Sequence, residues 1–292
     1  MKILVLGAGG MLGHKLYEVL GKEYDTYGTI KNDFSEYEKF GIFDKNKTFE
    51  RVDAEDFATV ERAIEKAAPD VVINAVGVIK QLPAAKNVVR TLSINAIFPH
   101  RLAELAARGD FRLIGISTDC VFSGRGGGYR EVDAPDADDL YGKSKHLGET
   151  IGTNCLSIRT SIVGCELRTR HSLLEWFLSQ RGKHVKGFRR AFFSGFPTVV
   201  LAEVIAREIL PRPQLEGLYH VSSEKISKYE LLQLFDREFA TRIEIEADDD
   251  FAIDRSLDST KFRNLTGYRP PSWEEMAHAL AEDARRGRYG NK

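Results

Sequence analysis

The chain has 292 residues, and its 42 lysines and arginines almost balance 43 aspartates and glutamates, leaving a formal net charge of -1. This balance argues against nucleic acid or an anionic membrane surface as the main partner. The 42% hydrophobic fraction is enough for a large core, and no stretch approaches the roughly 18 apolar residues of a membrane span. The first apolar run is too short for a signal peptide, so we expect a cytoplasmic protein.

Short apolar runs and helical periodicity alternate along the first half of the chain. The runs predict strands over residues 3–6, 24–30, 71–76, 112–117 and 155–159, and the periodicity predicts helices over 11–20, around 60–67, around 92–107 and from about 140. Nearly continuous apolar strands separated by helices are typical of a parallel sheet covered on both faces. We therefore predict a Rossmann-type, doubly wound α/β fold.

The second half is less regular. It predicts helices around 172–180, 198–210, 227–240 and 272–286, with short strands near 184–188 and 217–222. The long Gly- and Asp-rich connection 123–139 is of a length that is often functional or mobile. Cys120, Cys155 and Cys165 are odd in number and lack metal-ligand spacing, so we expect neither a disulfide framework nor a metal site.

The glycine cluster GAGGMLG (7–13) follows the first strand and opens the first helix. Gly7, Gly10 and Gly13 would serve for a tight turn, for close approach of the backbone to a pyrophosphate, and for close packing of helix on strand. The helix N-terminus would offer free N–H groups to phosphates. A plain glycine turn is the alternative, but the repeated strand–helix pattern favours a bound dinucleotide.

The end of the second strand, TYGTIKND, bears on the choice of cofactor. A carboxylate there holds the ribose 2′-hydroxyl of NAD, whereas a cation accommodates the 2′-phosphate of NADP. Lys31 stands at this place and the nearest acid is Asp33, so we expect NADP(H) rather than NAD(H). Asp53 is a candidate for the adenine edge, although a helix-capping aspartate is the alternative.

A second set of polar residues follows at the other side of the predicted sheet. Tyr141 and Lys145 are four residues apart and would project from one face of a helix. An ammonium group near a phenol lowers a pKa that is normally about 10, so the tyrosine could exchange a proton with a substrate oxygen. Thr118 ends the strand 112–117, at the edge where ligands bind in such folds, and could hydrogen-bond the same oxygen.

Several motifs together resemble the extended short-chain dehydrogenase/reductase family, and more narrowly the dTDP-4-dehydrorhamnose reductase branch. They extend over nearly the whole chain: G-x-x-G-x-x-G (7–13), Asn74-Ala75, SINA (93–96), STDCVFSG (117–124), YGKSK (141–145), RTSIVG (159–164), FSGFPT (193–198), GLYHVSS (217–223) and RSLDSTKF (255–262).

The resemblance implies a role for each matching residue. Tyr141 would donate the proton, Lys145 would bind the nicotinamide ribose and lower the tyrosine pKa, and Thr118 would position the carbonyl. The implied cofactor-binding residues are Gly7, Gly10, Met11, Leu12 and Gly13 at the pyrophosphate, Asp53, Ala75, Val76 and Gly77 on the adenosine side, Arg159 at the nicotinamide end, and Lys31, Ala54, Asn95, Ser117, Tyr141 and Lys145. The implied substrate-binding residues are Lys80, Thr118, Asp119, Cys120, Val121 and Tyr141, with Arg189, Arg190 and Arg255 for a diphosphate through forked hydrogen bonds.

The implied reaction is reduction of a 4-keto-6-deoxy nucleotide sugar by NADPH or NADH, in deoxysugar or cell-surface polysaccharide biosynthesis. Residues 1–164 would bind the cofactor and 165–292 would form a smaller mixed α/β substrate domain, with about 190–212 returning to the first. Extended members often dimerise through two helices, which would be those near 92–107 and 140–152 here.

Two departures leave other functions open. Cys120 replaces the family tyrosine, and AVGVIKQLPAAKN (75–87) replaces an acid-containing segment beside the substrate, so the sugar is not specified. Because Asp119 is followed by cysteine rather than glutamate, dehydration is disfavoured. A nucleotide-sugar epimerase with the same Tyr/Lys pair and a non-catalytic, NADP-binding regulatory subunit remain the alternatives.

Overall fold

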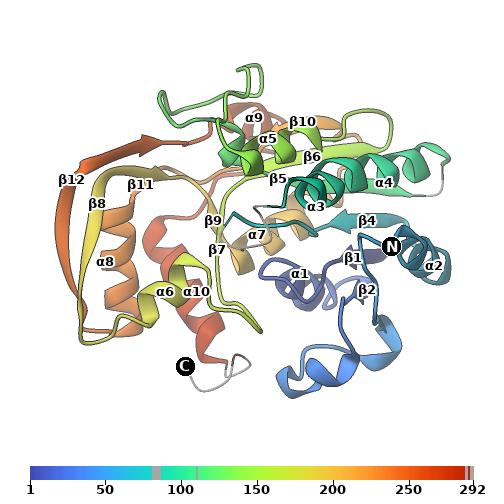
Figure 1. Ribbon diagram of the computed structural model, residues 1–292, viewed down its shortest axis with the longest axis horizontal. Coiled ribbons are helices and arrows are strands. Elements are labelled where there is room, and N and C mark those ends of the chain that lie inside the picture. Colours follow the sequence, from blue (N-terminus) through green and yellow to red (C-terminus); the bar gives the residue numbers. More distant parts are fainter. Residues whose placement is uncertain (81–86, 110, 287–288, 290–292) are drawn as a thin grey trace.

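The computed structural model describes residues 1–80, 87–109, 111–286 and 289, and within them the predicted α/β fold is confirmed. The principal sheet has seven parallel strands in the order β10-β6-β5-β4-β1-β2-β3 in the part of the chain described (Figure 1). These strands are β1 Lys2–Leu6, β2 Asp25–Thr29, β3 Thr48–Phe49, β4 Val71–Asn74, β5 Arg112–Thr118, β6 Cys155–Thr160 and β10 Gly217–His220.

Alternation along the strands builds a core on each face of this sheet. Ile3 and Val5 of β1 point into one core, with α1 (Gly13–Leu20), α7 (Thr198–Val204) and α10 (Trp273–Arg285). Leu4 and Leu6 point into the other, with α2 (Phe57–Ala67) and α4 (Phe98–Ala107). Burial on both faces explains why the strands are apolar without alternation in the sequence.

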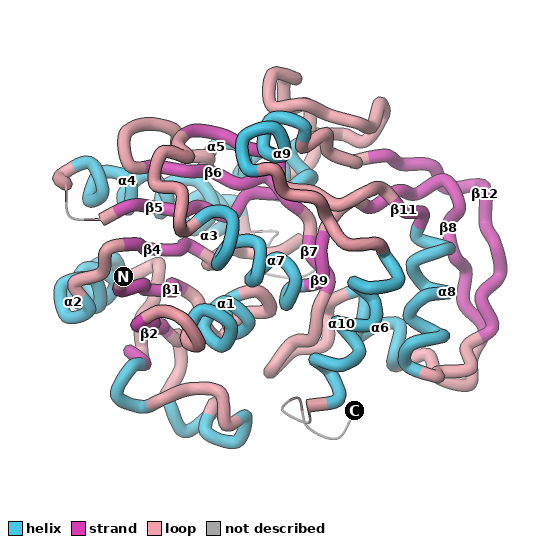
Figure 2. Tube along the Cα trace, turned by 180° about the vertical axis from the view of Figure 1, so that it is seen from behind, coloured by secondary structure: helices cyan, strands magenta, loops and turns pink. Residues whose placement is uncertain are grey.

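A smaller assembly stands beside the principal sheet, on the left of Figure 1 and the right of Figure 2. Strand β8 (His184–Phe193) pairs antiparallel with β11 (Ile226–Ser227) and parallel with β12 (Glu244–Asp254), and α8 (Lys228–Phe239) packs against β8. A further pair, β7 (Ile162–Val163) and β9 (Phe196–Pro197), lies between the two sheets (Figure 2).

The remaining described elements are short. They are the helices α3 (Val88–Leu92), α5 (Leu140–Leu147), α6 (Leu173–Leu178) and α9 (Thr260–Thr266), the π-helical turns η5 (Ser93–Ile97) and η7 (Ile205–Ile209), and the 3-10 turns η1 (Phe34–Glu36), η2 (Glu38–Phe40), η3 (Lys45–Lys47) and η6 (Asp119–Val121).

Three expectations about elements need correction. The helix expected over 92–107 is divided into α3, the π-helical turn η5 and α4. The helix expected over 198–210 is divided into α7 and the π-helical turn η7. The acidic segment EIEADDDFAID (244–254) is a strand, although no strand was predicted there. Pairing with β8 sets its conformation, and its exposed face can carry charged side chains.

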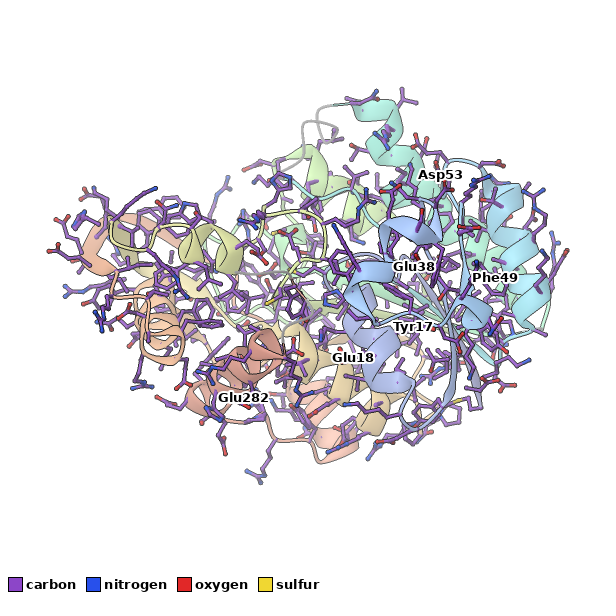
Figure 3. The ribbon with its side chains drawn as sticks, turned by 90° about the horizontal axis from the view of Figure 1, so that it is seen from below. Tyr17, Glu18, Glu38, Phe49, Asp53 and Glu282 are labelled. Carbon is purple, nitrogen blue, oxygen red and sulfur yellow. The ribbon has the colours of Figure 1, made fainter. Side chains whose placement is uncertain are left out.

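The C-terminal helix is fastened to the start of the chain. The Lys15 ammonium in α1 lies 2.7 Å from the Asp283 carboxylate in α10 and also pairs with Glu18. Figure 3, which labels Glu18 and Glu282, shows α1 and α10 side by side. Within the described ranges, no helix is long and apolar enough to cross a membrane.

Candidate active site

The glycine cluster forms a tight turn between β1 and α1. Gly7 has φ +77°, a conformation that residues with a side chain rarely adopt. A side chain at Gly13 would collide with the Gly7 carbonyl oxygen, so glycine there lets α1 pack directly on the loop. Gly7 thus provides the tight turn and Gly13 the close packing of helix on strand, and Gly10 is exposed.

A pocket of about 280 Å³ lies beside this loop, at the carboxyl ends of β1, β2 and β4. Such an edge is where open α/β sheets bind ligands. Eight of the predicted cofactor residues line it: Gly7, Gly10, Lys31, Asp53, Ala54, Ala75, Val76 and Gly77. The lining also includes residues that sequence reasoning missed, because their apolar spacing reads as core: Leu6, Val52, Val60, Val78, Ile94 and Phe98, together with Thr29 and Arg90.

Two cations and two carboxylates meet at the mouth of this pocket. The Lys31 ammonium lies 2.9 Å from Asp53 and 3.5 Å from Glu55, and Arg90 in α3 lies 3.0 Å from the same Glu55. Burial works to raise the pKa of Asp53, but the Lys31 hydrogen bond and a backbone N–H hold it below its usual value. The Asp53 carboxylate is therefore ionised, and the ion pairs with Asp53 and Glu55 hold the two cations side by side.

Eight predicted cofactor residues lie outside the pocket lining, and three of them are residues 11–13 at the start of α1. Leu12 and Gly13 are buried where α1 packs on the sheet, and Met11 is half-buried beside them. Leu12 belongs to the core on the α1 side of the sheet. We expect any contact of residues 11–13 with a phosphate to come from their backbone N–H groups at the helix start.

The predicted catalytic residues come together at the carboxyl end of β5. Thr118 ends that strand and accepts the Cys120 N–H at 3.1 Å, which caps η6. Helix α5 begins beside it, capped by Asp139, and a side chain at Gly142 would collide with the Cys120 carbonyl oxygen. Tyr141 thereby lies against Thr118, and the Lys145 ammonium reaches back to donate to the Ile116 carbonyl at 2.8 Å.

The protonation of this pair differs from expectation in one respect. Burial raises the pKa of Tyr141 above its ordinary value, and the Thr118 hydrogen bond only partly opposes it. Burial also lowers the pKa of Lys145 to about 8, against the attraction of Glu149. The expected lowering of the tyrosine pKa by Lys145 is therefore not found: desolvation dominates, and Tyr141 keeps its proton at neutral pH.

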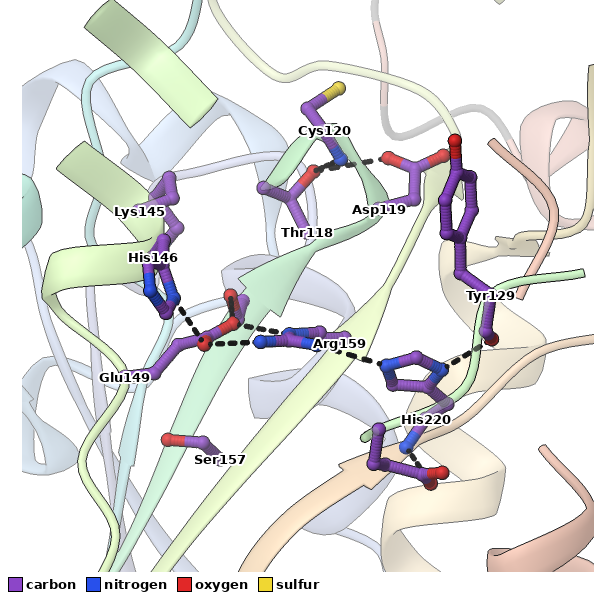
Figure 4. A network of polar contacts seen from close by, with 12 residues as sticks. Thr118, Asp119, Cys120, Tyr129, Lys145, His146, Glu149, Ser157, Arg159 and His220 are labelled. Carbon is purple, nitrogen blue, oxygen red and sulfur yellow. Dashed lines mark hydrogen bonds and ion pairs between the residues drawn. The ribbon is translucent and has the colours of Figure 1, made fainter. Parts of the chain in front are cut away.

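A buried ion pair, Glu149 with Arg159, lies near Lys145 and His146 of α5 (Figure 4). Glu149 accepts two hydrogen bonds from Arg159, at 2.7 and 2.8 Å, and one from Ser117 at 2.7 Å. Arg159 continues to His220, whose ring bonds the Tyr129 carbonyl. Arg159 is only 2% exposed, and its side chain and that of Ser117 are both bonded to Glu149. The place of residue 159 at the nicotinamide end stays a prediction.

Two further predicted residues have side chains that serve the framework. The Asn95 side chain accepts a hydrogen bond from the Val78 N–H and donates to the Val78 carbonyl and the Ser144 hydroxyl. It therefore fixes the segment after β4 against α5. Val121, expected at the substrate, is fully buried with Phe122 and Leu257. The side chains of Asn95 and Val121 are thus shielded inside the molecule, and the expected contacts of these residues with a ligand stay predictions.

The predicted substrate residues next to Thr118 are polar and mostly buried. Asp119 accepts a hydrogen bond from the Thr118 hydroxyl at 3.1 Å, and burial raises its pKa. Burial also raises the pKa of the free Cys120 thiol to about 12, so it stays uncharged. Lys80 pairs with Asp139 at 2.7 Å, which brings the segment after β4 to the start of the catalytic helix.

The three candidate arginines do not converge. Arg255 donates from Nε to the Phe122 carbonyl at 2.8 Å. This contact is close to the carboxyl end of β5 with the predicted catalytic residues, which we call the catalytic edge. Arg189 and Arg190 make their contacts with Asp249, at the irregularity in β12, and Arg189 also lies over the Tyr229 ring. Only Arg255 is therefore placed by its contacts beside Asp119. Sequence reasoning missed Lys228, whose charge also acts on Asp119.

Among the described residues, no group of three or more His, Cys, Asp or Glu side chains is arranged to hold a metal ion. The groups gathered at the catalytic edge are instead a hydroxyl, a protonated phenol and an ammonium. Such groups can orient a carbonyl and deliver a proton to its oxygen.

Comparison with known proteins supports one family over the whole length. The family model described as RmlD substrate binding domain matches residues 1–286. The chain is 27% identical to a dTDP-4-dehydrorhamnose reductase of Aggregatibacter actinomycetemcomitans, covering 94% of this chain and 96% of that protein. It is 28% identical to the spore coat polysaccharide biosynthesis protein SpsK of Bacillus subtilis, with 97% and 91% covered. Methionine adenosyltransferase 2 subunit beta of Danio rerio is 29% identical, with 79% and 71% covered.

Solved structures show the same fold. A hypothetical dTDP-4-dehydrorhamnose reductase from Sulfolobus tokodaii superimposes with a TM-score of 0.77 at 28% identity, covering 94% of this chain and 98% of that one. The dTDP-4-dehydrorhamnose reductase from Bacillus anthracis, solved in complex with NADP, has a TM-score of 0.78 at 24% identity, with 97% and 99% covered.

Proposed function

Because the chain belongs to the RmlD substrate binding domain family, we propose that it is an NAD(P)H-dependent reductase of a 4-keto-6-deoxy nucleotide-diphosphate sugar. The observation that carries this proposal is the convergence of Thr118, a protonated Tyr141 and Lys145 at one sheet edge beside a glycine-lined pocket. The full-length similarity to dTDP-4-dehydrorhamnose reductases supports the substrate class.

The pocket, the two hydroxyls and the lysine would each have a separate role in the reaction. The glycine loop and the pocket would hold a dinucleotide, which when bound and reduced supplies a hydride to the sugar carbonyl carbon. The Thr118 and Tyr141 hydroxyls would bind the carbonyl oxygen. Tyr141 would pass its proton to that oxygen as negative charge develops there, and its raised pKa keeps the proton available until then. Lys145 would hold ribose hydroxyls beside the tyrosine.

The proposal is tested by following absorbance at 340 nm with purified protein, NADPH and a panel of 4-keto-6-deoxy sugar nucleotides. We expect steady NADPH loss with one of them, and a roughly 10²- to 10⁴-fold lower turnover in Tyr141→Phe. Tyr27→Phe, on β2 and stacked on Phe49, is the matched control and should match the wild type. Near-normal turnover by Tyr141→Phe would overturn the mechanism.

The same experiment separates the alternatives. A nucleotide-sugar epimerase would convert a nucleotide sugar without net loss of NADPH. The similarity to methionine adenosyltransferase 2 subunit beta keeps a non-catalytic, NADP-binding regulatory subunit as the second candidate. That function would leave every nucleotide sugar in the panel unchanged.

We propose NADP(H) as the preferred cofactor. Lys31 and Arg90 stand together at the pocket mouth, where a 2′-phosphate would find two cations, and arginine suits phosphate through forked hydrogen bonds. Lys31→Ala and Arg90→Ala should each raise the KM for NADPH roughly 10-fold or more and leave that for NADH nearly unchanged. Lys47→Ala, whose ammonium pairs with Asp25 at the other end of β2, is the control. Equal effects on both cofactors would contradict the preference.

We also propose that the two halves of the chain bind different ligands, and that the protein forms a homodimer. Residues 1–164 would hold the cofactor and 165–292 mainly the sugar nucleotide; the packing of α7 on α1 supports a return of residues near 190–212 to the first part. Exposed Ile97 in η5, Leu147 at the end of α5 and Ile151 shortly after it support a dimer surface there. The His100 ring bonds the Leu147 carbonyl at 2.7 Å and ties these segments together.

A further inference from the structure

One lysine near the catalytic edge has a position that helix stability does not explain. Lys228 is the first residue of α8, after the capping residue Ser227. A cation in the first turn is opposed by the helix dipole. The capping box between Ser227 and Glu230 already satisfies backbone N–H groups at the start of α8, so the Lys228 charge is not needed there.

The Lys228 ammonium lies 4.1 Å from the centre of the Phe193 ring, and no carboxylate among the described residues lies within ion-pair distance of it. Lys225, three residues earlier, makes a revealing comparison. Its ammonium also lies over a phenylalanine ring, that of Phe192 at 4.7 Å, but it pairs with Asp254 at 3.3 Å and its side chain is 55% exposed. Lys228 is thus a half-buried cation that lacks the counter-ion its exposed neighbour has.

Strand register brings Arg255 to the same place. Asp254 is paired with Phe192 across β12 and β8, so Arg255 follows beside Phe193, whose ring carries Lys228. The Arg255 Nε bonds the Phe122 carbonyl, and no partner is found in the described ranges for its two terminal nitrogens. The two cations therefore come from different elements, and both act on the same Asp119.

None of the described groups that face Lys228 forms an ion pair with it. From η6 it meets Asp119 and Cys120, whose pKa values burial raises; β8 presents the Phe193 ring, and Glu230 on its own helix is bonded to Ser227. Arg255 acts on the same Asp119 from the segment after β12. Burial lowers the pKa of Lys228 to about 8, against the attraction of Asp119 and Cys120.

We propose that Lys228 binds the diphosphate of the nucleotide sugar together with Arg255, in place of the exposed pair Arg189 and Arg190. This proposal rests on the proposed function, because that function supplies the diphosphate. Two cations of different geometry suit such a group: the guanidinium can fork across two phosphate oxygens, and the ammonium acts as a point charge. Thr118, bonded to Asp119, places the carbonyl site next to this pair.

The test is calorimetric titration of the protein with UDP and dTDP, against uridine and thymidine. Lys228→Met keeps an apolar stem on Phe193 and removes the charge, so it should weaken diphosphate binding roughly 10- to 100-fold and leave nucleoside binding unchanged. Lys225→Met is the matched control and should change neither. Lys228→Arg should restore tight binding.

The pH dependence separates a binding role from a structural one. Wild-type affinity for the diphosphate should fall as the pH rises through about 8, where Lys228 loses its proton, whereas Lys228→Arg should keep its affinity to higher pH. Unchanged diphosphate binding by Lys228→Met, folded as judged by its urea midpoint and its NADPH binding, would overturn the proposal alone. Failure of the wild type to bind either diphosphate would overturn the proposed substrate class as well.

Discussion

Glu149 shows how a single residue outside the recognised motif supports the site. It follows Lys145 by four residues, and it receives Arg159 through two hydrogen bonds and Ser117 through a third. Burial works to raise the pKa of Glu149, but these hydrogen bonds and that of His146 hold it below its usual value. The carboxylate therefore stays charged and contributes to keeping Lys145 protonated.

We expect Glu149→Gln to lower the free energy of unfolding by about 3 kcal/mol, because it leaves the Arg159 guanidinium buried without a counter-charge. The measurement is urea denaturation, and the double variant Glu149→Gln/Arg159→Met should recover part of the loss. Since the native pKa is the lower one, the ion pair stabilises at neutral pH and its contribution is lost as pH falls below the ordinary glutamate value of about 4.3. The single variant should therefore lose less stability in acid than the wild type; an equally steep loss would contradict this.

At the scale of elements, the connection 123–139 joins the catalytic edge to the segment after β12. Its backbone bonds residues 253–258 at several points: Asp254 N to Gly124 O, Tyr129 N to Ser256 O, and Asp258 N to Tyr129 O. The Tyr129 ring stacks on Phe122 at 4.1 Å. The long loop is thus a fixed bridge, and it holds Arg255 beside Phe122.

Gly124 is the position at which this bridge tolerates no side chain. It has φ +88°, and a side chain there would collide with Ile253. We expect Gly124→Ala to cost roughly 2 kcal/mol of stability and to speed proteolysis of the loop after Arg125 or Arg130. Gly126→Ala is the control, because φ of Gly126 is outside the left-handed region and a Cβ there would make ordinary contacts with the Tyr129 side chain, at 3.7 Å or more. Equal stability of the two variants would show that the bridge is not under this constraint.

At the scale of the whole molecule, the proposed dimer surface carries exposed apolar side chains. Ile97, Leu147 and Ile151 are each more than half exposed and lie on the segments that form the proposed dimer surface. Leaving such side chains in water is unfavourable, and contiguous apolar patches commonly mark contacts between proteins.

The proposed dimer makes a direct prediction about molecular mass. The wild type should elute as a dimer in size-exclusion chromatography with light scattering, and Ile97→Lys should shift it to the monomer by placing a charge in the interface. Val132→Lys, at an 81% exposed position in the loop 123–139, should leave the mass unchanged. A wild-type protein that is monomeric at all concentrations would refute the surface.

The sequence by itself was sufficient for the fold class, the glycine turn and the meeting of Thr118 with the Tyr141 helix. These features rest on local information: apolar runs buried on both faces, glycines at one turn, and four-residue spacing on one helix face. The carboxyl ends of parallel strands share one edge, so residues following different strands could be expected together.

Only the tertiary structure decided which charges are free to act. Arg159 and Arg255 look alike in the sequence, yet one is enclosed by Glu149 and the other stands beside the catalytic edge. Lys228 became a candidate through its neighbours on β8 and η6, which are far away along the chain. The charge state and availability of a side chain depend on burial and on partners brought together by long-range packing, and no local pattern encodes these.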